Sequence, residues 1–179
     1  HPILCSLTPR NAWDDKDSTI VTRVKQTFGL WAKQVAEAEN IPFLDLNEIS
    51  ARKFEKFGKE KVKYMFYLDR IHTSRFGARV NAESAAEGIR MMPGLELAEY
   101  LKVVKPDTMT GATRKAGCPV LFVIGDSTVK NTDNDPDGQW GWGSVIADYF
   151  RSQKITVENC AMAGRSARTF LNEGRWDKV

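Results

Sequence analysis

The chain of 179 residues is poor in histidine and cysteine and has no large excess of charge of either sign. It contains two histidines, three cysteines, and 26 basic against 23 acidic residues, which gives a net charge of +3. No apolar run approaches the roughly 20 residues of a membrane-spanning helix, so we expect no membrane partner. The basic residues are scattered rather than clustered, so we expect no nucleic-acid partner either.

The small number of cysteines limits covalent cross-linking. Three thiols cannot all pair within one chain, and Cys5 and Cys118 adjoin apolar, strand-like runs where free thiols behave as small core side chains. We therefore expect buried free thiols. No signal peptide is recognisable, and the chain opens at His1 as a mature or trimmed product would, which leaves the compartment open on these grounds.

Strands and helices alternate along the first hundred residues. Hydrophobic patterning predicts strands at 2–7 and 41–46 and helices at 24–40, at 47–57 and after His72. This alternation predicts an α/β fold, with a parallel sheet covered by helices on both faces.

A segment without periodicity interrupts this pattern. Residues 102–117 are rich in Lys, Pro, Asp, Thr and Gly, which is typical of a linker or a long surface loop. A second unit follows, with a strand at 120–124, a helix across 145–150 and a strand at 155–159.

Ser127 follows the first strand of this second unit. Ligands of open parallel sheets bind at the carboxyl ends of strands, which is where the motif Gly125-Asp126-Ser127 places a serine. The alternative is an ordinary turn. Val129 occupies the place of the last glycine in a Gly-x-Ser-x-Gly elbow, which argues against an ordinary α/β-hydrolase.

A serine nucleophile needs a base, and His1 and His72 are the only histidines. Asp69 precedes His72 by three residues, so its carboxylate can hold one ring nitrogen and leave the other free to act as the base. The alternative is a surface histidine, with Asp69 capping the following turn.

Gly164 lies between a predicted strand and a predicted helix. A glycine there lets the backbone approach a ligand, and N–H groups at a helix start stabilise developing negative charge, so Gly164 is a candidate oxyanion donor. A tight turn with Ser166 capping the helix is a compatible interpretation.

An acidic loop imitates the start of an EF-hand but lacks its end. Asp133, Asp135 and Asp137 are present, while Ser144 occupies the twelfth position, where a bidentate Glu is required. We therefore interpret the segment as a solvated loop and expect neither a metal nor a cofactor.

Taken together, the motifs resemble the SGNH (GDSL) hydrolases, specifically the rhamnogalacturonan acetylesterases. The motifs that carry this resemblance are Gly125-Asp126-Ser127-Thr128, Gly141-Trp142-Gly143, the segments 163–170 and 173–176, and Asp69-Arg70-Ile71-His72. The resemblance implies a three-layer α/β/α, flavodoxin-like fold and removal of O-acetyl groups from pectic polysaccharide. It also implies a secreted or periplasmic location and an acetylated polysaccharide or oligosaccharide as partner.

The resemblance also assigns roles to residues. Ser127 resembles the nucleophile, with His72 and Asp69 completing the triad, and the backbone N–H groups of Ser127 and Gly164 resemble the oxyanion donors.

Four further residues are expected to bind substrate. The guanidinium of Arg165 or Arg175 matches a galacturonate carboxylate, with structural ion pairing as the alternative. Trp140 and Trp142 would wall a sugar pocket, with core packing as the alternative.

Two departures from the family pattern concern order and completeness. His72 precedes Ser127, the reverse of the family order, and we find no strand ending in Gly-x-Asn-Asp, whose asparagine supplies a third oxyanion donor. Three accounts explain these departures. In the first, the domain is circularly permuted. In the second, residues 1–101 are the C-terminal half of one SGNH-like domain and residues 118–179 are the N-terminal half of another, joined in tandem by the linker 102–117. In the third, a central segment is missing from the sequence.

The departures leave two rival functions beside the acetylesterase. One is a non-catalytic fragment or carbohydrate-binding remnant of a tandem protein. The other is a lipid or aryl esterase of the same fold.

Overall fold

The computed structural model describes residues 1–24, 27–102, 117–130 and 138–179. Most of the predicted linker and the three aspartates of the predicted acidic loop lie outside these ranges.

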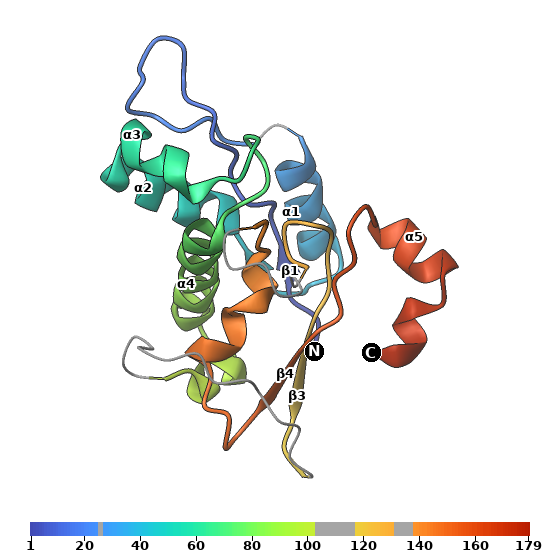
Figure 1. Ribbon diagram of the computed structural model, residues 1–179. Coiled ribbons are helices and arrows are strands. Elements are labelled where there is room, and N and C mark those ends of the chain that lie inside the picture. Colours follow the sequence, from blue (N-terminus) through green and yellow to red (C-terminus); the bar gives the residue numbers. More distant parts are fainter. Residues whose placement is uncertain (25–26, 103–116, 131–137) are drawn as a thin grey trace.

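The described residues form helices and short strands. In chain order these are β1 (Leu4–Cys5), α1 (Phe28–Ala38), β2 (Phe43–Leu44), α2 (Leu46–Phe57), α3 (Lys59–Val62), η1 (Lys63–Met65), α4 (Arg75–Met91), η2 (Glu96–Tyr100), β3 (Val120–Val123), η3 (Trp142–Ser144), η4 (Ile146–Tyr149), β4 (Thr156–Asn159), α5 (Ala167–Asn172) and η5 (Arg175–Lys178), where η marks a 3-10 helix (Figure 1).

The strands pair in parallel, which confirms the predicted α/β class. In β1 and β2, Leu4 lies opposite Phe43, and in β3 and β4, Val120 lies opposite Thr156. Among the described residues these pairs are two separate two-stranded sheets, whereas one continuous sheet was expected. Such small sheets gain most of their stability by packing against helices.

The two halves of the chain share one hydrophobic core around α4. Its buried face, which includes Ala78, Ala82 and Ala85, packs in one cluster with Val123 and Ile146 from the second half. Small side chains on this face let η3 and η4 pack closely against α4. Figure 1 shows this part of the chain beside α4. An antiparallel bridge between Leu101 and Phe150 adds a backbone connection. In this chain the segments before and after the predicted linker therefore pack as one body.

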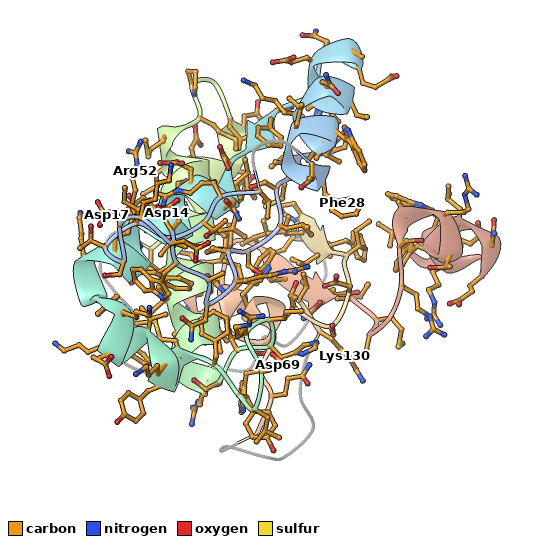
Figure 2. All side chains as sticks on the ribbon, turned by 90° about the horizontal axis from the view of Figure 1, so that it is seen from above. Asp14, Asp17, Phe28, Arg52, Asp69 and Lys130 are labelled. Atoms are coloured by element: carbon orange, nitrogen blue, oxygen red, sulfur yellow. The ribbon has the colours of Figure 1, made fainter. Side chains whose placement is uncertain are left out.

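Helix α1 differs from its prediction in the face that it buries. The apolar residues at helical spacing, Phe28, Trp31 and Val35, are 60%, 56% and 51% exposed, while the buried positions of the helix are Gly29 and Ala36. The small residues allow a close approach to β1 and β2, and the large ones face outward, as Phe28 does in Figure 2. The helix was predicted correctly and its buried face was not.

The predicted helix at 145–150 was also wrong in type. Val145, Ile146, Tyr149 and Phe150 are buried, as helical spacing suggested, but the backbone forms the short 3-10 turns η3 and η4. A 3-10 helix rarely continues beyond one turn, and Phe150 is already extended.

All three cysteines are free, as expected, and each is partly rather than completely buried. Burial raises the pKa of the Cys5 thiol to about 12. Within the described ranges, no helix has the length and apolar character needed to cross a membrane.

Candidate active site

Asp69 and His72 lie on a short loop between η1 and α4. An antiparallel bridge between Phe66 and Thr73 closes this loop, and the Tyr67 N–H donates to the His72 carbonyl at 2.8 Å. Leu68 has a positive φ of 56°, which turns the chain toward Asp69. The loop is therefore fixed by its own backbone hydrogen bonds.

The Asp69 carboxylate organises the loop and holds the histidine ring. One oxygen accepts the backbone N–H groups of Ile71 and His72, each at 2.7 Å, and the other lies 2.6 Å from His72 Nδ1. Partial burial raises the pKa of Asp69, but the hydrogen bonds from the His72 ring and from these two N–H groups outweigh it, and they lower the pKa to about 2. Asp69 is therefore ionised at neutral pH and orients the imidazole.

Ser127 lies in the turn after β3. The Asp126 side chain accepts the Thr128 N–H at 2.9 Å and its hydroxyl at 2.8 Å, and the Asp126 carbonyl accepts the Val129 N–H at 3.1 Å. A Cβ at Gly125 would lie 2.6 Å from the Val129 side chain, so the turn closes this tightly only with glycine there. Asp126 thus shapes the turn that presents Ser127.

The structure brings Ser127 and His72 together. His72 Nε2 lies 2.9 Å from Ser127 Oγ across 55 residues of sequence. The two loops are marked by Asp69 and Lys130 in Figure 2. Asp69, His72 and Ser127 therefore form a continuous chain of hydrogen bonds, in which the imidazole can accept the serine proton while the carboxylate stabilises the resulting positive charge.

A third segment, residues 140–143, connects the two loops. The Trp140 N–H donates to the Thr73 carbonyl at 2.8 Å, and the Thr73 hydroxyl donates to the Trp140 carbonyl at 2.6 Å. On the other side, the Trp142 N–H donates to the Thr128 carbonyl at 3.0 Å. Sequence reasoning missed Thr73, and its position directly after His72 is the only feature of the sequence that could have pointed to it.

Trp140 and Trp142 pack against the shared core and are partly buried. The Arg75 guanidinium lies over the Trp140 ring, 5.1 Å from its centroid, where a cation–π contact is favourable. This packing fits the core interpretation of both tryptophans and leaves a role in sugar binding as a proposal.

Gly164 lies on the segment that leaves β4. This segment runs beside β3 as far as Met162, whose N–H donates to the Gly125 carbonyl at 2.9 Å. Gly164 itself is exposed and has a φ of +72°. Ser166 caps α5 in a capping box with Thr169, as expected. Between Gly164 and Ser127 the described residues show no direct hydrogen bond, so the oxyanion role of Gly164 stays a prediction.

Arg165 and Arg175 share one carboxylate on the exposed arm that carries α5. Arg165 Nε lies 3.0 Å from one Glu173 oxygen, and Arg175 Nε donates to the other. The hydrogen bond from Arg175 and then that from Arg165 lower the pKa of Glu173. Ion pairing was the alternative expected for both arginines, and it is the arrangement found here.

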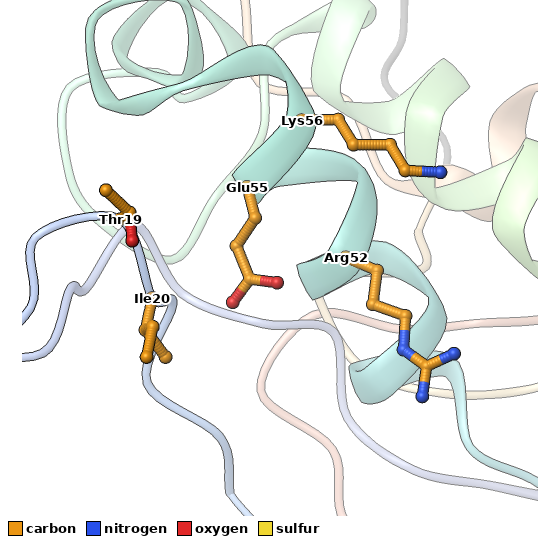
Figure 3. A pocket seen from close by; sticks show the side chains of 5 residues that line it. All are labelled: Thr19, Ile20, Arg52, Glu55 and Lys56. Atoms are coloured by element: carbon orange, nitrogen blue, oxygen red, sulfur yellow. The ribbon is translucent and has the colours of Figure 1, made fainter.

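A pocket of about 460 Å³ lies elsewhere, between α2 and the preceding loop (Figure 3). Its lining residues are Thr19, Ile20, Arg52, Glu55 and Lys56. Glu55 already binds Arg23 and the Val21 N–H, and Arg52 binds Glu48, so its main polar groups serve the fold. Across the described ranges, no cluster of three or more His, Cys, Asp or Glu residues is placed to hold a metal.

The second half of the chain matches a known family. The sequence profile of the family GDSL-like Lipase/Acylhydrolase matches residues 121–176, which contain Ser127 and Gly164 but neither Asp69 nor His72. This part of the chain is thus similar to the GDSL-like lipases and acylhydrolases.

The chain is also similar to three curated proteins with names. Over 59 residues the chain is 42% identical to the probable rhamnogalacturonan acetylesterase YesY of Bacillus subtilis and 36% identical to the rhamnogalacturonan acetylesterases of Emericella nidulans and RhgT of Bacillus subtilis. These matches cover 33% of this chain and 26%, 20% and 25% of the respective relatives. The matched part of the chain therefore spans about a quarter of their length or less.

Among solved structures, the YXIM protein of Bacillus subtilis aligns with a TM-score of 0.45 and 24% sequence identity. The alignment covers 49% of this chain and 25% of that protein.

Proposed function

We propose that the protein is a carbohydrate esterase that removes O-acetyl groups from pectic polysaccharide through a serine acyl-enzyme. The observation that carries the proposal is the chain of hydrogen bonds from Asp69 through His72 to Ser127, with distances of 2.6 and 2.9 Å. The match of residues 121–176 to the GDSL-like Lipase/Acylhydrolase profile supports the same chemistry.

The geometry supports a two-stage reaction. His72 Nε2 accepts the Ser127 proton as Oγ attacks the acetyl carbonyl carbon, and the backbone N–H groups of Ser127 and Gly164 hold the resulting oxyanion. Collapse of this intermediate breaks the ester bond, and His72 returns the proton to the departing sugar hydroxyl. Water, deprotonated by His72, then attacks the acetyl-serine, which releases acetate and regenerates the serine.

The proposed substrate is acetylated pectic polysaccharide, because three similar sequences carry the name rhamnogalacturonan acetylesterase. A uronate carboxylate would compete with Glu173 for the forked guanidinium groups of Arg165 and Arg175. Trp140 and Trp142 lie near the serine turn and would contribute a sugar-facing wall. A polymeric substrate would be met outside the cytoplasm, so we also propose a secreted or periplasmic location.

The test compares hydrolysis of a small acetyl ester by the wild type, Ser127→Ala and Ser152→Ala. Ser152 lies outside the site and controls for the loss of a hydroxyl group. We expect Ser127→Ala to lose at least about 10⁴-fold in kcat and Ser152→Ala to match the wild type. Equal rates in all three proteins would overturn the esterase assignment. A second assay identifies the substrate class: we expect acetate to be released from acetylated rhamnogalacturonan but not from acetylated xylan.

The missing Gly-x-Asn-Asp block favours one second candidate, a carbohydrate-binding remnant. Loss of a single oxyanion donor typically costs about 10²- to 10³-fold in turnover, which weakens catalysis without abolishing it. If the protein is a binding remnant, the wild type would release no acetate, and Ser127→Ala would bind pectic oligosaccharide as tightly as the wild type. A lipid or aryl esterase would instead prefer long-chain or aryl esters over acetylated sugars.

The tandem arrangement is likewise a proposal about the parent protein. It is the rival of the shared triad, because it assigns 1–101 and 118–179 to two different domains, each with its own complete site in the longer chain. The coding frame on both sides of this segment tests it, because the tandem account requires a strand ending in Gly-x-Asn-Asp after Val179. A frame that ends without such a strand would contradict it.

A further inference from the structure

The distance between His72 and Ser127 depends on two parts of the chain that are far apart in sequence. Their loops are joined by one segment, residues 140–143, which we name the brace. The brace makes two hydrogen bonds to Thr73, at 2.8 and 2.6 Å, and bonds of 3.1 and 3.0 Å to the carbonyls of Lys130 and Thr128. Thr73 and Thr128 are the residues that directly follow His72 and Ser127, so the brace connects to the chain beside both reacting side chains.

The glycines of the brace show how closely it fits the serine turn. A Cβ on Gly141 would lie 2.2 Å from the Lys130 carbonyl oxygen, and one on Gly143 would lie 2.4 Å from the Val129 carbonyl oxygen. These neighbours are backbone atoms, which cannot move aside without moving the turn. Asn159 adds a further hydrogen bond of 2.8 Å to Val129. The serine side of the brace is therefore rigid.

On the histidine side, one side chain completes the connection. Thr73 is 3% exposed, and its hydroxyl donates to the Trp140 carbonyl. Its own carbonyl takes the Trp140 N–H, so the residue after His72 is held at two points. Loss of the hydroxyl would leave one of these two hydrogen bonds between Thr73 and the brace, and so would weaken the connection of the His72 loop to the brace.

We propose that Thr73 is a positioning residue, whose hydroxyl holds the His72 loop on the brace and so places the imidazole against Ser127. The inference rests on the proposed function. Thr73 touches no reacting atom and acts through Trp140. A displacement of about 1 Å in such a pair can cost on the order of 10²-fold in rate.

The kinetic test uses Thr73→Val, which removes the hydroxyl at nearly constant volume. Thr156→Val is the matched control, since Thr156 is also 3% exposed but lies in β4, away from both loops. We expect kcat on a small acetyl ester to fall at least about 10-fold in Thr73→Val with KM changed less than about 2-fold, and Thr73→Ser to restore most of the rate. Equal kcat values in Thr73→Val and Thr156→Val would overturn the proposal.

A spectroscopic test keeps the inference separate from turnover. With only two histidines, the ¹⁵N resonances of the His72 ring are assigned with the single variant His72→Gln. Ser127→Ala should shift the Nε2 resonance in the wild type, because the hydrogen bond is lost, and should shift it much less in a Thr73→Val background. Equal shifts in both backgrounds would refute a positioning role. The shifts themselves do not depend on turnover, so a failed esterase assay contradicts the function alone.

Discussion

The region around Ser127 and His72 and the arm that carries α5 are held in different ways. In the first region, hydrogen bonds join residues that are 55 and 67 positions apart, and Thr73 and Val129 are buried. In the arm, every described hydrogen bond after Met162 joins residues at most eight positions apart, as between Arg165 and Glu173. Figure 1 and Figure 2 both show α5 standing away from the main body.

This difference follows the chemistry proposed for each region. Proton transfer between Ser127 and His72 requires a separation fixed to a few tenths of an ångström, which dense long-range packing supplies. The arm would contact a polymer that varies along its length, and the contacts described in it are a local helix cap and surface ion pairs. Mutations in the two regions should therefore differ in how strongly they change kcat and how strongly they change the free energy of unfolding.

Of the substitutions that compare the two regions, Asp69→Asn is expected to have the largest effect. The amide keeps the size of the side chain, but its oxygen is needed to accept the Ile71 and His72 N–H groups, so its NH2 group would face Nδ1. The imidazole would then carry its proton on Nε2, which is the wrong tautomer to accept a proton from Ser127. We expect kcat to fall by roughly 10³- to 10⁴-fold with little change in KM, as measured with a small acetyl ester. A loss below about 10-fold would mean that Asp69 only shapes the loop.

Gly164→Ala tests the arm. Alanine keeps the N–H but disfavours the φ of +72°, at a cost of about 1–2 kcal/mol, and the space around the site is open. If Gly164 donates to the oxyanion, kcat should fall by about 10²- to 10³-fold, well beyond the loss of stability. Gly94→Ala, with the same φ and equally open space, is the matched control and should keep wild-type activity.

Gly141→Ala tests the braced region, with stability as the main readout. The new methyl group would meet the Lys130 carbonyl at 2.2 Å, so the turn must move. Urea unfolding should show a loss of about 1–3 kcal/mol, and the His72–Ser127 contact should weaken with it. Unchanged stability would show that the brace is looser than its contacts indicate.

The smallest effect is expected on thermal stability, from neutralising one carboxylate in each region. The pKa of Asp69 is about 2, below its ordinary value of 3.8, and that of Glu173 is also lowered. A carboxylate whose pKa is lowered in the folded protein stabilises the fold at pH values above its unfolded-state pKa. This stabilisation is lost as the pH falls through its folded-state pKa. Thermal unfolding should therefore separate the wild type from Asp69→Asn and Glu173→Gln at pH 6, with the differences shrinking as pH falls and the Asp69 difference disappearing only below about pH 2. Added salt should reduce the Glu173 difference, because both of its ion pairs are at the surface.

Local patterns predicted most of the individual elements. Helix α2 ends at Gly58, with a φ of +79°, and Ser166 caps α5, because such signals act within a few residues. The buried face of α1 and the 3-10 turns after Gly143 were not predictable in the same way. They depend on what packs against them, and large apolar residues at helical spacing cannot show which neighbour will be present.

The chemistry of the candidate site was visible in the sequence, since it contains only two histidines, an aspartate three residues before His72 and a serine after a predicted strand. The sequence by itself determined which groups could react and how Asp69 would hold its histidine, because that contact is local. Only the tertiary structure decided that Ser127 and His72 meet, and that Thr73 and the brace lie between their loops. Such contacts depend on the packing of both halves around α4, which no short stretch of sequence encodes.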